Sequence, residues 1–151
     1  MKRLFITLVA TLLVALTLPA QENVFEKYAD TEGVTTVYIS KKMFNMMKDV
    51  KSEDLNLGTL SGKINDMQIL TCEDKGTVAK LRKDIAYISP DNGYEELMRV
   101  REEGERITIY AKEGKKENEY ILLVDDSEEL VLIQINGQLT LEELQSVVST
   151  Q

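Results

Sequence analysis

The sequence contains no histidine, no tryptophan, one cysteine and two prolines among its 151 residues. Without histidine, the chain cannot build a Ser-His or Cys-His nucleophile pair, an imidazole metal site or the commonest general base. Without a second cysteine, it cannot form an internal disulfide. Stability must therefore come from packing. No catalytic residues are identified, so a non-enzymatic role is the favoured interpretation.

Basic residues are also in short supply. The chain has 18 lysines and arginines against 26 acidic residues, a net charge of −8, and the basic residues are interleaved with acidic ones. Binding to nucleic acid requires clustered basic side chains, so no nucleic-acid partner is expected. The glycines are isolated and do not form a phosphate-binding pattern, so no cofactor is expected either.

The N-terminal 20 residues, MKRLFITLVATLLVALTLPA, have the pattern of an export signal. Lys2 and Arg3 precede an apolar run over residues 4–18, and cleavage is expected before Gln21. The run is shorter than the roughly 20 residues that cross a bilayer, so the mature protein should have no transmembrane helix. We expect an exported protein of the periplasm or cell envelope, with residues 1–20 removed.

Residues 21–151 have the length of a single domain. β-Branched residues predict a strand at 34–40, and Ser40 is placed to cap the helix that follows it. A second strand is expected at 67–72. The next helix should present one apolar face, made of Val78, Leu81, Ile85 and Ile88.

From Tyr94 onward the apolar period becomes that of strands. A hairpin over 94–112 should place Arg106, Thr108, Tyr110 and Lys112 on a wet face, and a second hairpin should run over 120–135. Thr140 and Glu143 form a capping box for a C-terminal helix. The order predicts an α+β fold, a two-layer sandwich in which β-α-β-α precedes a four-strand meander. Its sheet is mostly antiparallel, with the helices mainly on one face.

The second hairpin is apolar in both alternating phases. Helices on one side of the sheet would leave part of it exposed, and large exposed apolar patches mark binding sites. The alternative is that residues 21–33 or 51–65 cover these strands. One phase holds Ile121, Leu123, Val131, Ile133 and Ile135. The other phase is the candidate interaction surface, namely Tyr120, Leu122, Val124, Leu130 and Leu132.

Three other groups of residues could carry chemistry, and each has a simpler interpretation. Cys72 ends an apolar strand and is expected to be a packed thiol. The acidic residues of 125–129 are expected to form a solvated hairpin tip, with weak Ca²⁺ binding as the alternative. Met43, Met46 and Met47 share a helix face, which favours core packing over an adaptable binding surface or a soft-metal site. No metal is expected.

Four blocks of sequence carry a resemblance to a known family. They are FEKYADTEGVTTVYISKKMF at 25–44, ILTCED at 69–74, GYEELMRV at 93–100 and LVLIQINGQLTLEEL at 130–144. With its export signal, the chain resembles the bacterial exported family known as domain of unknown function 4252. That resemblance implies a protein of the cell envelope without assigned activity or catalytic residues, and no site is carried over from it.

These observations favour a non-catalytic envelope module that binds a protein, a peptide or a second copy of itself. A carrier of a small apolar ligand is the alternative, followed by a carboxylate-based hydrolase. The three differ in what the fold must provide. A binding module needs a flat apolar patch, a carrier needs an enclosed apolar cavity, and a hydrolase needs two carboxylates that face each other in a cleft.

Overall fold

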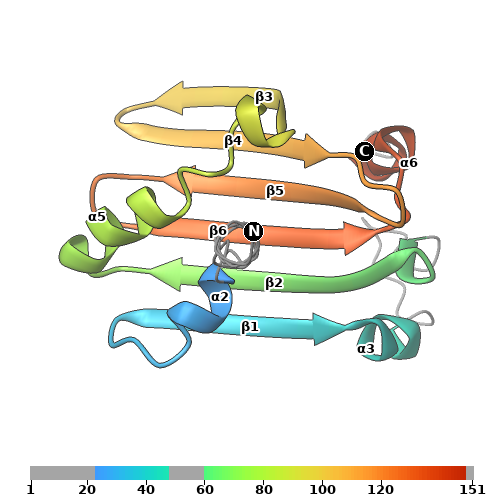
Figure 1. Ribbon diagram of the computed structural model, residues 1–151, viewed down its shortest axis with the longest axis horizontal. Coiled ribbons are helices and arrows are strands. Elements are labelled where there is room, and N and C mark those ends of the chain that lie inside the picture. Colours follow the sequence, from blue (N-terminus) through green and yellow to red (C-terminus); the bar gives the residue numbers. More distant parts are fainter. Residues whose placement is uncertain (1–22, 48–59, 149–151) are drawn as a thin grey trace, which may run out of the picture.

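The computed structural model describes residues 23–47 and 60–148, with side-chain surroundings up to Leu144. The expected signal at 1–20 lies outside the described residues. At the centre is a six-stranded antiparallel sheet with the strand order β1-β2-β6-β5-β4-β3 (Figure 1). The strands are β1 (Val34–Ser40), β2 (Ile64–Cys72), β3 (Glu95–Glu102), β4 (Glu105–Lys112), β5 (Asn118–Asp125) and β6 (Leu130–Gly137).

This topology confirms the predicted meander of β3 to β6, in which each strand pairs with the next in sequence. The first two strands extend the same sheet because β2 pairs with β6. The strand β2 begins at Ile64, earlier than its apolar run suggested, and a register shift between Ile64 and Asp66 accommodates its first residues. The meander and the β-α-β start therefore form one continuous sheet.

The described helices are short, and the two predicted caps, at Ser40 and Thr140, are confirmed. Ser40 accepts a hydrogen bond from the Met43 N–H at 3.3 Å. Thr140 and Glu143 bond reciprocally, with the Thr140 N–H donating to Glu143 Oε2 at 2.9 Å and the Glu143 N–H donating to Thr140 Oγ1 at 3.3 Å. The helical elements are α2 (Val24–Lys27), α3 (Lys41–Met46), α5 (Lys75–Asp84), the 3₁₀ turn η1 (Pro90–Asn92) and α6 (Leu141–Val148).

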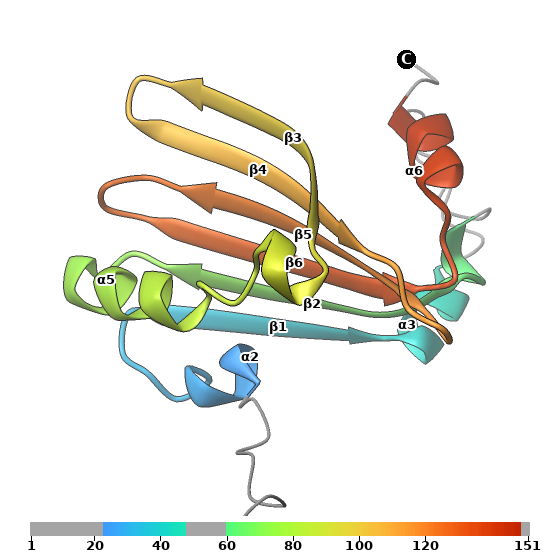
Figure 2. The ribbon, with the colours of Figure 1, turned by 45° about the horizontal axis from the view of Figure 1, so that its top comes forward.

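The main core lies between one face of the sheet and the layer formed by α2, α5 and the segment that follows α5 (Figure 2). The four residues of the predicted apolar face, Val78, Leu81, Ile85 and Ile88, are all buried. The helix itself is shorter than predicted, because α5 ends at Asp84 and Ile88 lies in the segment that follows it. These four residues pack against the sheet side chains Leu70, Cys72, Ile121, Leu130 and Leu132. The fold is thus the predicted two-layer α+β sandwich.

Polar contacts fasten α2 to α5. The Tyr28 hydroxyl donates to Asp84 Oδ2 at 2.5 Å, and Lys27 Nζ lies 3.1 Å from the same oxygen. Burial, followed by the hydrogen bond to Asp84, raises the pKa of Tyr28 to about 12. The hydrogen bonds from Tyr28 and Lys27 hold the pKa of Asp84 below its ordinary value of 3.8. The N-terminal arm is therefore held on the α5 side of the sheet.

A second apolar cluster closes one end of the opposite face. Its buried members are Phe44, Leu60, Ile64, Tyr120 and Leu139. Asn118 Nδ2 and the Tyr120 hydroxyl both donate to the Leu139 carbonyl, at 3.0 and 2.8 Å. These bonds fix the chain between β6 and α6. The helix α6 consequently stands at this end of the sheet, across from the α5 layer.

The end of β6 passes very close to the start of β2. A Cβ at Gly137 would lie 2.2 Å from the Lys63 carbonyl oxygen, and that oxygen also accepts a hydrogen bond from the Gln138 N–H at 2.8 Å. Gly62 has no atom within 4 Å of its Cβ position. The close approach at Gly137 therefore requires glycine.

We expect Gly137→Ala to lower the free energy of unfolding by about 1–3 kcal/mol, because the added methyl group forces two backbone segments apart. Gly62→Ala is the matched control and should change the value by less than about 0.5 kcal/mol. Urea denaturation of both variants measures the difference. Equal stability of the two variants would contradict the close approach.

The Tyr28–Asp84 contact also predicts a pH dependence. The folded-state pKa of Asp84 is lowered, so its contribution to stability is fully present above its unfolded-state value of 3.8 and is lost as the pH falls through the folded value. Asp84→Asn should unfold more easily than wild type at pH 7, and the difference should shrink below pH 3.8. Denaturation curves at several pH values measure this difference; a constant gap would contradict the assignment.

Candidate functional site: the open face of the sheet

The strand register aligns apolar side chains across the sheet face away from α5. One central row crosses all six strands, and each member lies opposite the next in the antiparallel pairing. No charged residue interrupts this row. From edge to edge it consists of Val37, Ile69, Ile133, Leu122, Ile109 and Met98.

A neighbouring row on the same face is also uncharged. It contains Thr35, Thr71, Val131, Val124, Ile107 and Val100. We call these two rows together the open face. Its outer members are exposed, with Val37 at 43%, Met98 at 46% and Val100 at 41%, and its inner members are partly buried by one another.

The open face deepens into a hollow beside α6. The hollow has a volume of about 870 Å³ and lies over the central row. Leu141 and Leu144 of α6 form one wall, and Leu97, at a register shift in β3, lies at another side. Its volume falls within the range of small-molecule pockets, roughly 300–1,000 Å³. Unlike an enclosed cavity, it is open to solvent along the sheet.

The predicted wet face of the first hairpin is wrong. Thr108 is 1% exposed and Tyr110 packs against the main core, whereas Arg106 is exposed as expected. Lys112 is half-buried, with Nζ 4.8 Å from the centre of the Tyr94 ring. Alternation reveals two faces but not which one is covered. Pairing with β5 turns the polar side of β4 toward the helix layer.

The predicted interaction surface is divided between the two faces. Leu122 and Val124 lie on the open face, and Tyr120 lies at its closed end, where it is 8% exposed. Leu130 and Leu132 are instead buried in the main core, at 0% and 1% exposure. The role of this surface in binding stays a prediction.

The length of the β5–β6 turn explains the division. Asp125 pairs with Leu130, so each odd-numbered residue of β5 faces an even-numbered residue of β6. Leu122 therefore lies beside Ile133, not Leu132. Within this hairpin, the open-face residues missed by sequence reasoning are Val131 and Ile133. The length of the turn could have identified them, because four residues between Asp125 and Leu130 place odd-numbered residues of β5 beside even-numbered residues of β6.

The predicted packing of the α3 methionines is also wrong for two of the three. Met43 is 48% exposed and Met46 is 70% exposed, while Met47 packs against the second apolar cluster, which contains Phe44 and Tyr120. The helix ends at Met46 and is only six residues long. Phe44 is its one buried residue and provides its anchor.

The other candidate groups have structural roles. Cys72 is fully buried, as expected of a packed thiol. At the acidic turn, Asp125 accepts a hydrogen bond from Arg82 Nε at 2.8 Å, which ties the hairpin tip to α5. Lys75 and Glu128 form a second ion pair at 2.6 Å between α5 and this tip. Within residues 23–47 and 60–148 there is no cluster of three metal-ligating side chains.

Glu119 is the carboxyl whose surroundings are most unusual. Burial raises its pKa, and it accepts a hydrogen bond from the Tyr94 hydroxyl at 2.9 Å. Tyr94 also contacts Tyr87 edge to face, with ring centres 6.1 Å apart. The group lies on the α5 side of β5 and does not line the hollow. It fastens the segment after α5 to the sheet.

None of the described helices is both long and apolar enough to span a membrane.

The two faces of β6 predict opposite responses to the same substitution. Leu132→Glu buries an unpaired charge in the main core and should cost about 3–5 kcal/mol of the free energy of unfolding. Ile133→Glu leaves its carboxylate in reach of water on the open face and should cost less than about 1.5 kcal/mol. Urea denaturation measures both. Unfolding of both variants would show that the open face is buried.

Comparison with known proteins identifies a family and nothing closer. The sequence model of the family described as "Domain of unknown function (DUF4252)" matches residues 28–147. No curated protein and no solved structure matches the chain. The matched residues include all six strands and the helices from α3 to α5. The chain therefore belongs to the family of domain of unknown function 4252.

Proposed function

We propose that this protein is an exported, non-catalytic module of the cell envelope that binds an apolar surface of a partner protein through its open face. The observation that carries the proposal is the uncharged central row, which runs across six strands without a covering layer among the described residues. Contiguous apolar patches of this kind mark interaction sites on soluble proteins.

The energetics favour a covering partner. Six strands spaced about 4.8 Å apart make a face roughly 29 Å wide. Removing a Val, Leu or Ile side chain fully from water contributes about 1.5–3 kcal/mol. The outer residues Val37, Met98 and Val100 are still exposed in the free protein, so a large part of this free energy is gained only when a partner covers them. Covering them therefore yields several kcal/mol toward association.

The residue types on this face indicate which kind of partner surface can bind it. An uncharged surface matches another apolar surface. An anionic membrane surface is disfavoured because the chain carries a net charge of −8. The centre of protein interfaces is similarly depleted of charge, with a polar rim around it. Glu102 and Glu105 supply such a rim where β3 turns into β4.

The N-terminal sequence pattern supports the proposed location in the cell envelope. Lys2 and Arg3 followed by the apolar run at 4–18 form the pattern of a cleaved signal. The lack of histidine supports a non-catalytic role, since the usual acid-base groupings are missing from the sequence.

The hollow beside α6 favours a second candidate function, the carriage of a small apolar ligand. Its volume of about 870 Å³ and its lining by Leu97, Leu141 and Leu144 suit an aliphatic molecule. The open side of the hollow is the reason that we place this candidate second. A bound aliphatic molecule would leave one flank in water.

The proposal predicts the effect of charges placed on the open face. Leu122→Lys with Ile133→Glu puts a charge on two facing strands of the central row and leaves the net charge unchanged. Native mass spectrometry of the protein isolated from its own cell envelope should find wild type bound to one partner protein at fixed stoichiometry. The double variant should lose that partner while its circular dichroism spectrum is unchanged.

A matched control places the same charges on the helix layer. Ala79→Lys with Ala86→Glu alters two exposed positions on the α5 side and also leaves the net charge unchanged. This control should keep the partner. Retention of the partner by the folded open-face variant would contradict the proposal. A small apolar molecule bound to wild type in place of a protein would favour the carrier.

A further inference from the structure

The two edges of the sheet differ in how they are protected. An edge strand presents unpaired N–H and C=O groups, and proteins block it with charges, bulges or a covering element. The edge strand β3 has both of the first two devices, since five of its eight residues are charged and its register shifts between Glu96 and Met98. Its edge is therefore closed to other strands.

The opposite edge strand, β1, has neither device. Its sequence VTTVYIS contains no charge and no proline, and it pairs with β2 at every position from Val34 to Ser40 without a register shift. Tyr38 is 64% exposed and Val37 is 43% exposed. Figure 1 shows β1 at the border of the sheet, and none of the described strands pairs with its outer side. This edge has the properties of one that pairs with another strand.

We propose that β1 pairs antiparallel with β1 of a second copy, with the two Val37 residues facing each other on a two-fold axis. A two-fold interface of this kind is self-complementary and closes at two copies. The sheets of the two copies would then join into one sheet, with their open faces continuous. The proposal is independent of which molecule binds the open face.

The charges that flank β1 select the second copy over other strands. Acidic residues, Asp30 and Glu32, precede the strand, and basic residues, Lys41 and Lys42, follow it. Antiparallel pairing about Val37 brings the acidic end of one copy to the basic end of the other. Glu32 lies in the turn before β1 and Lys42 in the first turn of α3, both five residues from Val37, so this register brings the turn of one copy to the start of α3 in the other.

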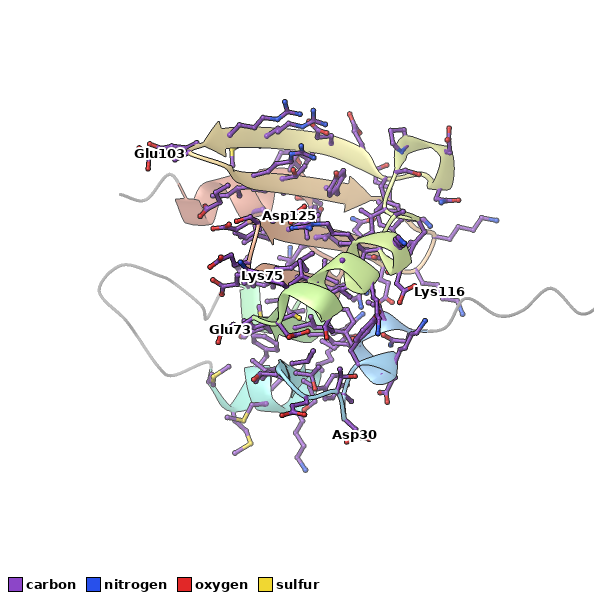
Figure 3. The ribbon with its side chains drawn as sticks, turned by 90° about the vertical axis from the view of Figure 1, so that its left-hand side faces the viewer. Asp30, Glu73, Lys75, Glu103, Lys116 and Asp125 are labelled. Carbon is purple, nitrogen blue, oxygen red and sulfur yellow. The ribbon has the colours of Figure 1, made fainter. Side chains whose placement is uncertain are left out.

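All four flanking residues are exposed, and Figure 3 shows Asp30 at the opposite edge of the sheet from Glu103. A parallel arrangement of the two β1 strands would instead bring like charges together at both ends. Opposite charges across a strand pair stabilise it, whereas like charges destabilise it. The charge pattern therefore favours antiparallel self-pairing.

The side chains within β1 are compatible with this register. Thr36 of one copy faces Tyr38 of the other, and Thr35 faces Ile39, so no like charges meet. Pairs of threonine or β-branched residues with aromatic residues are favourable neighbours across strands, at roughly 0.2–1 kcal/mol each. The small number of such pairs predicts a dimer that dissociates on dilution.

Cysteine cross-linking tests the proposed axis. In Val37→Cys the two thiols would lie across one strand pair, within reach of a short bis-maleimide. Met98→Cys is the matched control, because Met98 lies in the same row at the other edge and has nearly the same exposure, 46% against 43%. The protein, purified as its cell produces it, should yield cross-linked dimer for Val37→Cys only. Equal cross-linking of both variants, or none for Val37→Cys, would overturn the proposal.

A charge exchange tests the register. Glu32→Lys and Lys42→Glu should each raise the dimer dissociation constant severalfold in analytical ultracentrifugation, because each brings like charges together at both ends of the strand pair. The double variant should return close to wild type. If the single variants and the double variant all dimerise like wild type, the antiparallel register is wrong.

The open-face variant separates this proposal from the proposed function. Leu122→Lys with Ile133→Glu lies away from β1 and should leave cross-linking through Val37→Cys unchanged. Loss of cross-linking in that background would show that copies associate through the open face, which would also overturn edge pairing.

Discussion

The packing of one helix layer against one face of the sheet is the interaction on which the rest of the structure depends. Val78 and Leu81 of α5 are fully buried against the sheet, and α2 is held beside them by the contact between Tyr28 and Asp84. Both faces of the sheet carry apolar side chains, but the described helices that cross the sheet lie on one of them. The two rows of the open face are uncovered because these helices lie on the other face of the sheet.

The second cluster determines how the uncovered face is shaped. Tyr120 and Leu139 close one end, and α6 stands beside them instead of lying along the strands. The result is a face that is hollowed near α6 and has no covering helix over its other strands among the described residues. A broad apolar surface suits a protein partner, and the hollow can receive an apolar side chain from that partner. The proposed pairing of β1 would double the width of this surface.

Much of the fold could be predicted from the sequence because local signals were strong. The β-branched residues of 34–40 and the capping box at Thr140 gave elements whose position the structure confirms. The apolar spacing of α5 predicted its buried face. The family, likewise, was recognised from four blocks of sequence, and the match over residues 28–147 confirms it.

The candidate site could be predicted only in part. Alternation in β4 separates Thr108 from Ile109 but does not say which of them meets a helix, since either side can be covered. For β5 and β6, the two-residue period was correct while the pairing depended on the turn, so Leu132 was placed on the wrong face. Burial of Phe44 and exposure of Met46 likewise reflect the short length of α3, which spacing alone does not fix.

The central claim is that the open face is exposed in the free protein and covered in its natural setting. Methionine oxidation measures this directly, because Met98 lies on the open face and Met46, at 70% exposure, lies on α3 as an internal reference. The account predicts that Met98 and Met46 oxidise at similar rates in the purified, dilute protein. It also predicts that Met98 becomes protected relative to Met46 in the intact cell envelope. An unchanged ratio between the two settings would contradict it.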